Sequence, residues 1–341
     1  MTFWDELPKP FFILAPMEEV TDIVFRKTIA RAGRPDVFFT EFTNAASYCS
    51  DKGCFSTEGR LKHDAAESPI VAQIWGTDPE HFRIMARGLK EQGFSGIDIN
   101  MGCPAKDVYK IGAGSGMIGN TELAGQIITA TATAGLPVSV KTRLGKSRLD
   151  EWQPWLSFLL QQNLANLTIH LRTRKEMSKV DAHYELIDDI CALRDQLAPQ
   201  TKITINGDIR DRAHGLRLKA EHPGVDGLMI GRGVFANPFC FEKAAEADIH
   251  SANASPVADI SHEQGQTEHP LADYIDLFRY QLEQYDKYRI INDRATRKFD
   301  PLKHFFKIYI KDFDGAADLR ARLYDCTTTD QVRAILDKYF A

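Results

Sequence analysis

Eight short apolar runs lie between residues 11 and 230, and longer helical patterns separate most of them; this alternation limits the possible folds strongly. Near-continuously apolar runs such as Ile70-Val71-Ala72 are typical of parallel strands covered on both faces. Eight βα units in about 235 residues predict an α/β fold, the TIM (β/α)8 barrel. A doubly wound open sheet is the alternative, but it does not usually need eight such units. The predicted strands are Phe11–Ala15, Asp36–Glu41, Pro69–Trp75, Gly96–Asn100, Pro137–Thr142, Asn166–Leu171, Thr201–Asn206 and Asp226–Ile230.

The alternation stops after Glu246. Residues 248–269 are polar and predict a linker or insertion. Helical patterns return from Pro270 onward and indicate a small α-helical domain. The predicted organisation is therefore a barrel at 1–247, a polar linker at 248–269 and a helical domain at 270–341.

Composition narrows the class of protein without naming a partner. The net charge of −5 provides no global field that would attract nucleic acid or anionic membrane, although a local basic patch is compatible with it. We find no apolar window long enough to span a membrane and no signal peptide at the start of the chain, so we expect a cytoplasmic protein. The six cysteines form no C-x-x-C pair and predict free thiols rather than a metal site.

Polar residues or glycines follow nearly every predicted strand. In a TIM barrel the carboxyl ends of the strands carry the active site, so we expect these residues to meet at one mouth. They are Pro16, Met17, Glu41, Gln73, Asn100, Lys141, Arg143, His170, Arg172, Asn206, Gly207, Asp208, Gly231 and Arg232.

The last two strand ends indicate what the mouth binds. Asn206-Gly207-Asp208 and Gly231-Arg232-Gly233 follow strands seven and eight, where many barrels bind a phosphate. Glycine lets the backbone approach the ligand, and Arg232 adds a guanidinium that can bind a phosphate through two parallel hydrogen bonds. Taken alone, each segment is explained equally well by a tight βα turn without a bound phosphate. Together with Lys141 in the same mouth, the two segments favour a phosphate-bearing cofactor.

Cys103 lies in the segment Asn100-Met101-Gly102-Cys103-Pro104, directly after the fourth predicted strand. Pro104 stiffens this turn, and a glycine-rich stretch at 112–116 follows it. A lone cysteine is more often structural, but a thiol in a polar loop at a strand end is placed to act as an acid or a nucleophile. The sequence therefore predicts a catalytic role for Cys103.

These motifs together resemble the bacterial-type tRNA-dihydrouridine synthases. The resemblance covers about residues 11 to 246 and is carried by Leu14-Ala15-Pro16-Met17, Asp98-Ile99-Asn100-Met101-Gly102-Cys103-Pro104, Val140-Lys141-Thr142-Arg143-Leu144-Gly145, Asn206-Gly207-Asp208 and Met229-Ile230-Gly231-Arg232-Gly233. It implies an FMN-dependent barrel followed by a helical domain, in which NADPH reloads the flavin. The implied reaction is the reduction of a specific uridine in tRNA to 5,6-dihydrouridine.

The resemblance also implies roles for individual residues. Hydride would pass from N5 of FMN to C6 of the uracil, and Cys103 would donate the proton to C5. Residues implied to bind the flavin are Pro16, Met17, Glu18, Gln73, Lys141 and His170, with Asn206, Gly207, Asp208, Gly231 and Arg232 at its phosphate. Asn100, Arg143 and Arg172 are implied to handle the substrate base and the RNA.

A basic segment at 287–311 contains eight basic and two acidic side chains, interleaved with aromatic residues. This arrangement is compatible with phosphate and base contacts, although a solvated basic face is the common alternative. The residues predicted to contact tRNA are Lys287, Arg289, Arg294, Arg297, Lys298, Lys303 and Lys307.

Two other functions fit parts of the pattern. An FMN barrel acting on a free pyrimidine, similar to the dihydroorotate dehydrogenases, can also use a loop cysteine, but it has no need of a basic helical domain. An RNA-binding protein that retains its flavin without turnover is the alternative from outside the enzymes, and the presence of both Cys103 and Lys141 argues against it. A monomer that binds tRNA is the default expectation.

Overall fold

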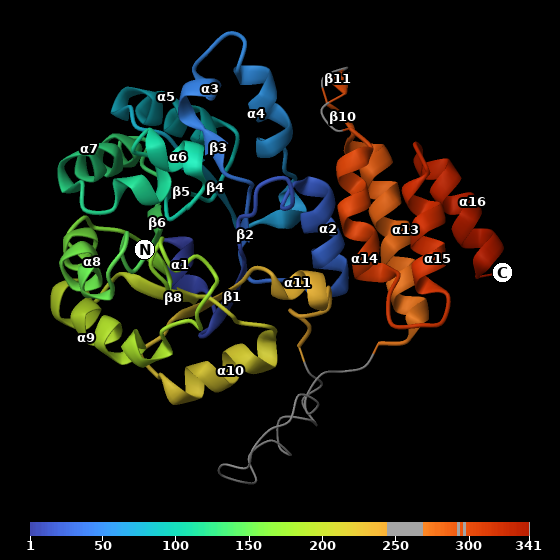
Figure 1. The fold of residues 1–341 in the computed structure, drawn as a ribbon. Helices are drawn as coiled ribbons and strands as arrows, with labels where there is room; N and C mark the ends of the chain where they lie inside the picture. Colours follow the sequence, from blue (N-terminus) through green and yellow to red (C-terminus); the bar gives the residue numbers. More distant parts are fainter. Residues whose placement is uncertain (244–268, 292–293, 296–297, 341) are drawn as a thin grey trace.

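The computed structural model describes residues 1–243, 269–291, 294–295 and 298–340 (Figure 1). Eight parallel strands form the barrel, and β1 pairs with both the last strand and, through the single bridge from Ile13 to Val37, with the second. The predicted TIM barrel is therefore confirmed. The barrel strands are β1 (Phe11–Leu14), β2 (Phe38–Phe39), β4 (Ile70–Trp75), β5 (Gly96–Met101), β6 (Val138–Arg143), β7 (Asn166–His170), β8 (Lys202–Asn206) and β9 (Gly227–Ile230).

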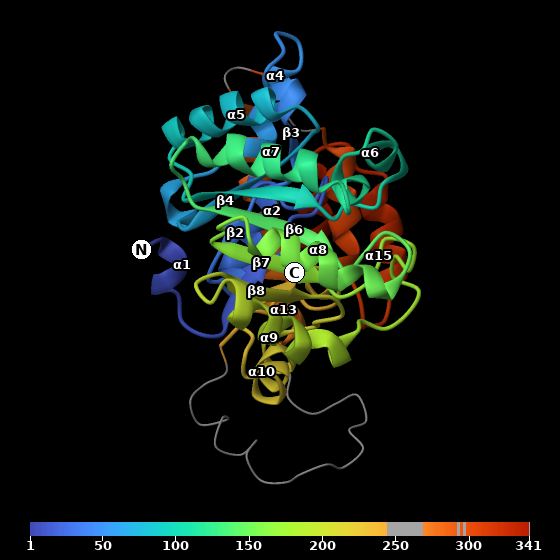
Figure 2. The same cartoon turned by 90° about the vertical axis from the view of Figure 1, so that its left-hand side faces the viewer.

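Helices follow the strands and surround the barrel (Figures 1 and 2). Local signals fix their starts: the Asp22 carboxylate accepts a hydrogen bond from the backbone N–H of Phe25 at 2.8 Å, and Asp78 caps a helix whose first residue is Pro79. The helices of this region are α1 (Phe3–Glu6), α2 (Ile23–Ala32), α3 (Ala45–Tyr48), α4 (Cys54–Leu61), α5 (Pro79–Glu91), α6 (Lys106–Lys110), α7 (Thr121–Ala132), α8 (Trp152–Leu160), α9 (Ile187–Leu197), α10 (Arg212–Glu221) and α11 (Gly233–Ala236). Short 3-10 helices lie at η1 (Ala65–Glu67), η2 (Gly114–Met117), η3 (Leu149–Glu151) and η4 (Tyr184–Leu186).

The second βα unit departs from the sequence expectation. The strand predicted over Asp36–Glu41 is reduced to Phe38–Phe39, and an additional short strand, β3 (Thr43–Asn44), pairs with the far end of β4. Helices α3 and α4 fill the connection that follows, and the sequence pattern did not indicate them. The barrel is thus least regular at the place where it closes.

The barrel interior is built from alternate residues of each strand, because successive side chains of a strand point to opposite faces. An apolar cluster occupies the interior beside β1, β2, β4 and β9, and Trp4 of α1 joins it. Figure 2 shows α1 at the end of the barrel opposite α6. A Cβ on Gly227 would lie 2.0 Å from Cε2 of Phe11, so glycine leaves room for that ring. The amino-terminal end of the barrel is therefore closed by aromatic packing.

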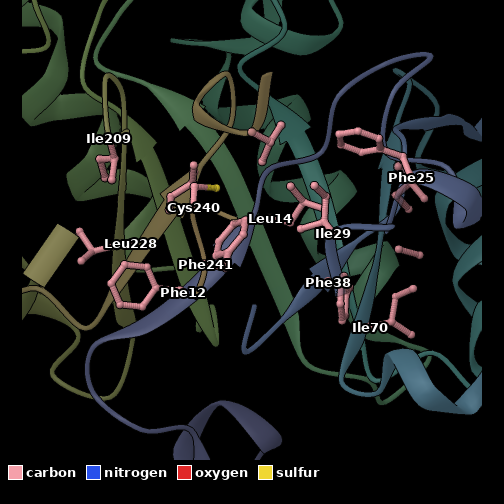
Figure 3. Packing of buried hydrophobic residues seen from close by; sticks show 14 of the residues in the cluster. Phe12, Leu14, Phe25, Ile29, Phe38, Ile70, Ile209, Leu228, Cys240 and Phe241 are labelled. Carbon is pink, nitrogen blue, oxygen red and sulfur yellow. The ribbon is translucent and has the colours of Figure 1, made fainter. Parts of the chain in front are cut away.

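The outward-facing residues of the same strands pack against the helices. Figure 3 shows Phe12 and Leu14 of β1 and Phe38 of β2 in this layer, with Phe25 and Ile29 of α2 beside them. All five side chains are fully buried. This layer fixes the strands from outside and leaves their carboxyl ends free to carry polar groups.

A helical region follows the barrel, as predicted, and packs against α2 (Figure 1). The rings of Phe25 and Phe305 stack with centroids 4.8 Å apart, and the Tyr288 hydroxyl donates to the Asp64 carboxylate at 3.1 Å. Its elements are α13 (Leu271–Tyr288), β10 (Ile290–Ile291), β11 (Arg294–Ala295), η5 (Asp300–Phe305), α14 (Phe306–Tyr309), α15 (Ala316–Tyr324) and α16 (Thr329–Tyr339). The predicted linker at 248–269 lies outside the described residues apart from His269. Among the helices described, none is long and apolar enough to cross a membrane.

Candidate active site

A cavity of about 500 Å³ opens at the carboxyl ends of β1, β6, β7, β8 and β9. This volume is within the range of pockets that bind small molecules and cofactors. Strand register brings lining side chains together, since His170 of β7 pairs with Asn206 of β8. The lining residues are Ala15, Pro16, Met17, Lys141, His170, Asn206, Gly207, Asp208, Ile209, Arg210, Gly231, Arg232, Gly233 and Ala236.

 Nine of the eleven residues predicted to bind the flavin line this cavity, and Glu18 and Gln73 lie outside its lining.

The end of the cavity formed after β8 and β9 suits a phosphate group. Gly207 has a φ of +125°, and a Cβ there would lie 3.1 Å from Cβ of Ala182 and 3.3 Å from Cδ2 of His170. The Tyr184 hydroxyl holds this turn by donating to the Gly207 carbonyl at 2.7 Å. Arg232 also lines the cavity, with its side chain 64% exposed, and its Nη2 atom donates to Oδ1 of Asp208 at 3.2 Å. The turn thus offers close backbone approach and an exposed guanidinium, which are the groups that a phosphate ester requires.

Lys141 supplies the positive charge inside the cavity. Its Nζ atom donates to Oδ1 of Asn206 at 3.1 Å, and Nδ2 of Asn206 in turn donates to the Met229 carbonyl at 2.8 Å. Burial, followed by the neighbouring charge of Arg143, lowers the pKa of Lys141 to about 8. Lys141 is therefore largely charged at neutral pH and becomes neutral in the mildly alkaline range.

His170 is neutral under the same conditions. Burial, with the charges of Arg143 and Lys141 added to it, holds the pKa of His170 well below its usual value. Its Nε2 atom lies 3.4 Å from Nη1 of Arg172. Because the guanidinium can only donate, Nε2 is assigned as the acceptor and Nδ1 as the protonated nitrogen.

Cys103 is held at the mouth by hydrogen bonds to its own backbone. Oδ1 of Asn100 accepts from the Cys103 N–H at 2.9 Å, and the Cys103 carbonyl accepts from the N–H of Ser115 at 3.0 Å and from its hydroxyl at 2.8 Å. Nε of Arg143 fixes the preceding Gly102 carbonyl at 2.9 Å. Burial raises the pKa of the Cys103 thiol, so the thiol stays protonated at neutral pH. A positioned, protonated thiol can act as a general acid.

A buried relay connects this loop to the barrel interior. Nδ2 of Asn100 donates to Oε1 of Gln73 at 2.9 Å, and Nε2 of Gln73 donates to Oδ2 of Asp98 at 2.7 Å. The Ser139 hydroxyl donates to the other Asp98 oxygen at 2.6 Å. Because Asp98 accepts both bonds, it orients the Gln73 amide, which then orients Asn100. The position of the Cys103 loop therefore depends on a carboxylate at the centre of the barrel.

Three charged residues predicted to contact cofactor or substrate form their hydrogen bonds and ion pairs with other protein groups in this structure. Arg143 donates to the carbonyls of Gly102 and Thr173, and Arg172 pairs with Asp208 and donates to the Val180 carbonyl at 2.6 Å. Both arginines are buried. Glu18 lies outside the cavity and pairs with Arg60 of α4 at 2.6 Å. In this arrangement all three brace the loops of the mouth, and their contacts with ligand or RNA stay predictions.

The basic residues predicted to contact tRNA belong to the helical region. Lys287, Arg289, Lys298 and Lys307 are exposed, whereas Lys303 pairs with Asp300 at 3.0 Å. Arg297 and the side chain of Arg294 lie outside the described residues. Lys298 also lines a separate cavity of about 620 Å³ between α4, α13 and η5. The structure thus gives four exposed cations on this segment.

Several residues that shape the site carried no clear signal in the sequence. In the sequence, Asp98 stands out only as part of the Asp98–Pro104 motif, although a carboxylate inside the buried strand Gly96–Met101 indicates a buried polar network. Ser115 and Tyr184 act through the backbone of other loops, and nothing in their sequence positions points to those partners. Arg210 lines the cavity just beyond the predicted Asn206–Asp208 turn and could have been included by extending that turn.

The fold and this cavity define a class: a (β/α)8 barrel that presents a phosphate-suited pocket beside a positioned cysteine thiol. The model of the dihydrouridine synthase (Dus) family matches residues 13–340. The chain belongs to this family.

Individual relatives support the same assignment. The chain is 52% identical over 337 residues to "Probable tRNA-dihydrouridine synthase 2" of Bacillus subtilis (strain 168), covering 99% of this chain and 96% of that protein. It is 51% identical over 339 residues to "Probable tRNA-dihydrouridine synthase" of Staphylococcus aureus (strain MRSA252), with the same coverage of 99% and 96%. A solved 2-naphthoyl-CoA reductase complex matches with a TM-score of 0.52 at 8% identity, over 71% of this chain and 50% of that one, and this likeness shows the fold alone.

Proposed function

We propose that this protein is an FMN-dependent tRNA-dihydrouridine synthase that reduces a specific uridine of tRNA, with NADPH as the reductant. The observation that carries the proposal is the Cys103 thiol, held at the barrel mouth by Asn100 and Ser115 beside a cavity suited to a phosphate-bearing cofactor. Membership of the dihydrouridine synthase family and the names of the relatives support the substrate class.

The residues present fit FMN. The turn at Gly207, with Arg232 above it, would hold the phosphate, and Met17 and His170 would line the ring system. Lys141 would place a cation against the electron-rich side of the ring, and neutral His170 avoids adding a second charge there. When bound, reduced FMN would supply hydride to C6 of the uracil; this chemistry belongs to the cofactor.

Cys103 would complete the reduction by protonating C5. The 5,6 double bond of uracil is conjugated with the C4 carbonyl, so the proton is needed at C5 once C6 has received hydride. A thiol whose pKa is raised by burial keeps that proton available at neutral pH. Asn100 and Ser115 fix the loop from both sides, and this limits the positions from which the thiol can reach the base.

The tRNA must deliver an unstacked base to this mouth, which costs a few kcal/mol. Exposed Lys287, Arg289, Lys298 and Lys307 on the helical region would offset part of this cost through phosphate contacts. We propose that the helical region is the main RNA-binding surface and that the reaction takes place at the barrel mouth.

The test uses purified protein with its visible spectrum recorded, followed by incubation with NADPH and an unmodified tRNA transcript. We expect bound flavin, NADPH oxidation that depends on tRNA, and dihydrouridine in the nuclease-digested RNA by mass spectrometry. Free orotate serves as the parallel substrate, because a barrel acting on small pyrimidines would reduce it to dihydroorotate without RNA.

The outcomes separate the candidate functions. Dihydrouridine formed only from tRNA supports the synthase. Turnover of orotate without RNA would replace it with a small-substrate dehydrogenase. Protein that can neither be purified with FMN nor reconstituted with it would remove the cofactor on which the proposal depends.

A further inference from the structure

A second cavity, of about 580 Å³, lies on the rim of the barrel outside the pocket described above. It is formed by the loops that follow β5, β6 and β7 together with the starts of α7 and α8. Its lining residues are Tyr109, Ile118, Gly119, Thr121, Lys146, Ser147, Glu151, Pro154, Trp155, Arg174 and Lys175. Tyr109, Ile118 and Gly119 continue the segment that begins at Cys103, so the cavity borders the same mouth.

Its charges are unbalanced. Lys146, Arg174 and Lys175 line it, and within the part of the chain that the structure describes none of them forms an ion pair. Glu151 is the acidic residue in the lining, and its carboxylate accepts from the backbone N–H groups of Lys146 at 2.5 Å and Arg148 at 3.1 Å. Three cations therefore face one carboxylate that is already hydrogen-bonded elsewhere.

Arg174 is the most constrained of the three cations. Its backbone N–H donates to the Gly145 carbonyl at 2.8 Å, and its guanidinium carbon lies 3.9 Å from the centroid of the Tyr109 ring. Its Nε atom is buried and has no hydrogen-bond partner among the residues that the structure describes. A buried donor without a partner is uncommon in folded proteins, and a bound water, ion or ligand group is a common way to satisfy it. The ring beneath the guanidinium also holds its plane in place.

The arrangement favours a phosphate monoester over an RNA backbone. A phosphodiester chain carries single charges at intervals and is met by a row of cations, whereas a monoester concentrates about two charges on one group. Here three cations converge on one concave site, and Arg174 stacked on Tyr109 adds a flat surface suited to a purine. Arginine near a ribose is also the group that accommodates a 2′-phosphate in nicotinamide dinucleotide sites.

We propose that this cavity binds the 2′-phosphate-bearing adenosine half of NADPH, with Arg174, Lys146 and Lys175 around the phosphate. The inference rests on the proposed function, which makes NADPH the reductant. It assigns a place on the rim for the end of the dinucleotide that takes no part in hydride transfer, and it explains why cations are grouped behind the Cys103 segment.

Equilibrium binding tests the site without relying on turnover. We would titrate the flavin-loaded protein with 2′,5′-ADP and with 5′-AMP by calorimetry, in the wild type, in Arg174→Gln and in Lys146→Gln/Lys175→Gln. We expect the wild type to prefer 2′,5′-ADP and each variant to weaken its binding about tenfold or more, because charge-assisted hydrogen bonds are lost. Lys106→Gln/Lys110→Gln is the matched control, since it removes two exposed cations of α6 that lie outside the lining; we expect less than a twofold change.

Three results would overturn the inference: no binding of 2′,5′-ADP to the wild type, equal loss in the control variant, or weaker tRNA binding in Arg174→Gln with 2′,5′-ADP unaffected. The last result would identify an RNA contact instead. Reduction of tRNA by enzyme whose flavin has been reduced with dithionite needs no nicotinamide, so it checks the synthase separately. Failure of that reaction would count against the proposed function, whereas its success alongside unaltered 2′,5′-ADP binding in Arg174→Gln would count against the cavity alone.

Discussion

The two sides of the barrel interior differ in kind. Beside β1, β2, β4 and β9 the inward positions form an apolar cluster that includes Phe11, Ile13 and Met229. Beside β5 to β8 they are polar, and their side chains bond to one another: Thr204 donates to Asn166 at 2.7 Å, and Ser139 donates to Asp98 at 2.6 Å. One side is held by packing and the other by hydrogen bonds with fixed partners.

This difference allows one barrel to combine stability with a reactive mouth. Packing of apolar side chains does not require specific hydrogen-bond partners. The apolar side can therefore close the barrel where strand pairing is reduced to a single bridge. A polar side costs desolvation, but each satisfied bond fixes an orientation. The carboxyl ends of the polar side carry Asn100, Lys141 and His170, and their directions are set by the strands below them.

The largest effect is expected at Cys103, which tests whether the polar side serves chemistry rather than stability. Cys103→Ala should reduce the single-turnover rate of dihydrouridine formation by about 10²–10⁴-fold, because the general acid is lost. Flavin content and the melting temperature should match the wild type. Cys54→Ala, which removes a partly exposed cysteine of α4, is the control. An unaltered rate in Cys103→Ala would exclude the proton-donor role.

The apolar side should show the reverse behaviour. Ile13→Ala should lower the free energy of unfolding by about 2–5 kcal/mol, since it leaves a cavity in the interior, whereas Ile13→Val should cost about 0.5–1.5 kcal/mol. Denaturant unfolding measures both, and flavin stoichiometry of the folded protein should stay the same. Flavin loss from a variant of normal stability would mean that the two sides are not separate in function.

Asp98 gives the polar side a pH-dependent signature. Burial raises its pKa to about 6, although hydrogen bonds from Ser139 and Gln73 act in the opposite direction. The folded state therefore holds a proton that the unfolded state has released, and stability falls as pH rises from about 4 to 6. Relative to Asp98→Asn, the wild type should gain about 2 kcal/mol between pH 7 and pH 4.5.

Comparing the wild type with Asp98→Asn at both pH values removes the contributions that the two proteins share. One of these comes from Glu41, whose pKa is raised to about 7 by burial. The comparison is measured as unfolding free energies of the two proteins at the two pH values. A constant difference between them across this range would show that Asp98 is ionised in the folded state throughout.

The smallest effect concerns Lys141. Because its pKa is lowered to about 8, its charge is present below that pH and lost above it. The dissociation constant for FMN should rise by up to about tenfold between pH 7 and pH 9. Lys141→Arg should remove this dependence, since arginine stays protonated. Flavin fluorescence quenching measures both proteins, and an identical pH profile in the variant would assign the titration to another group.

The order of strands and helices could be predicted from the sequence because hydrophobic periodicity repeats in every βα unit. The second unit could not, since Phe38–Phe39, β3, α3 and α4 depend on how the barrel closes. At the site, Lys141 and Asn206 could be predicted because they lie at the carboxyl ends of strands. The hydrogen-bonded relay through Gln73, Asp98 and Ser139 could not be predicted, because it joins three strands whose register the sequence does not state. Arg143 and Arg172 illustrate the same point, since Arg143 donates to the Thr173 carbonyl in the loop after β7 and Arg172 pairs with Asp208 in the loop after β8.

Helix α2 has a consequence for how this protein can be divided. It covers the barrel with Ile29 on one face, and its Phe25 stacks on Phe305 of the helical region. A barrel cut before residue 270 would expose this aromatic surface to water and to other copies of itself. Exchange of helical regions between relatives would therefore succeed only if the matching surface of α2 is exchanged as well.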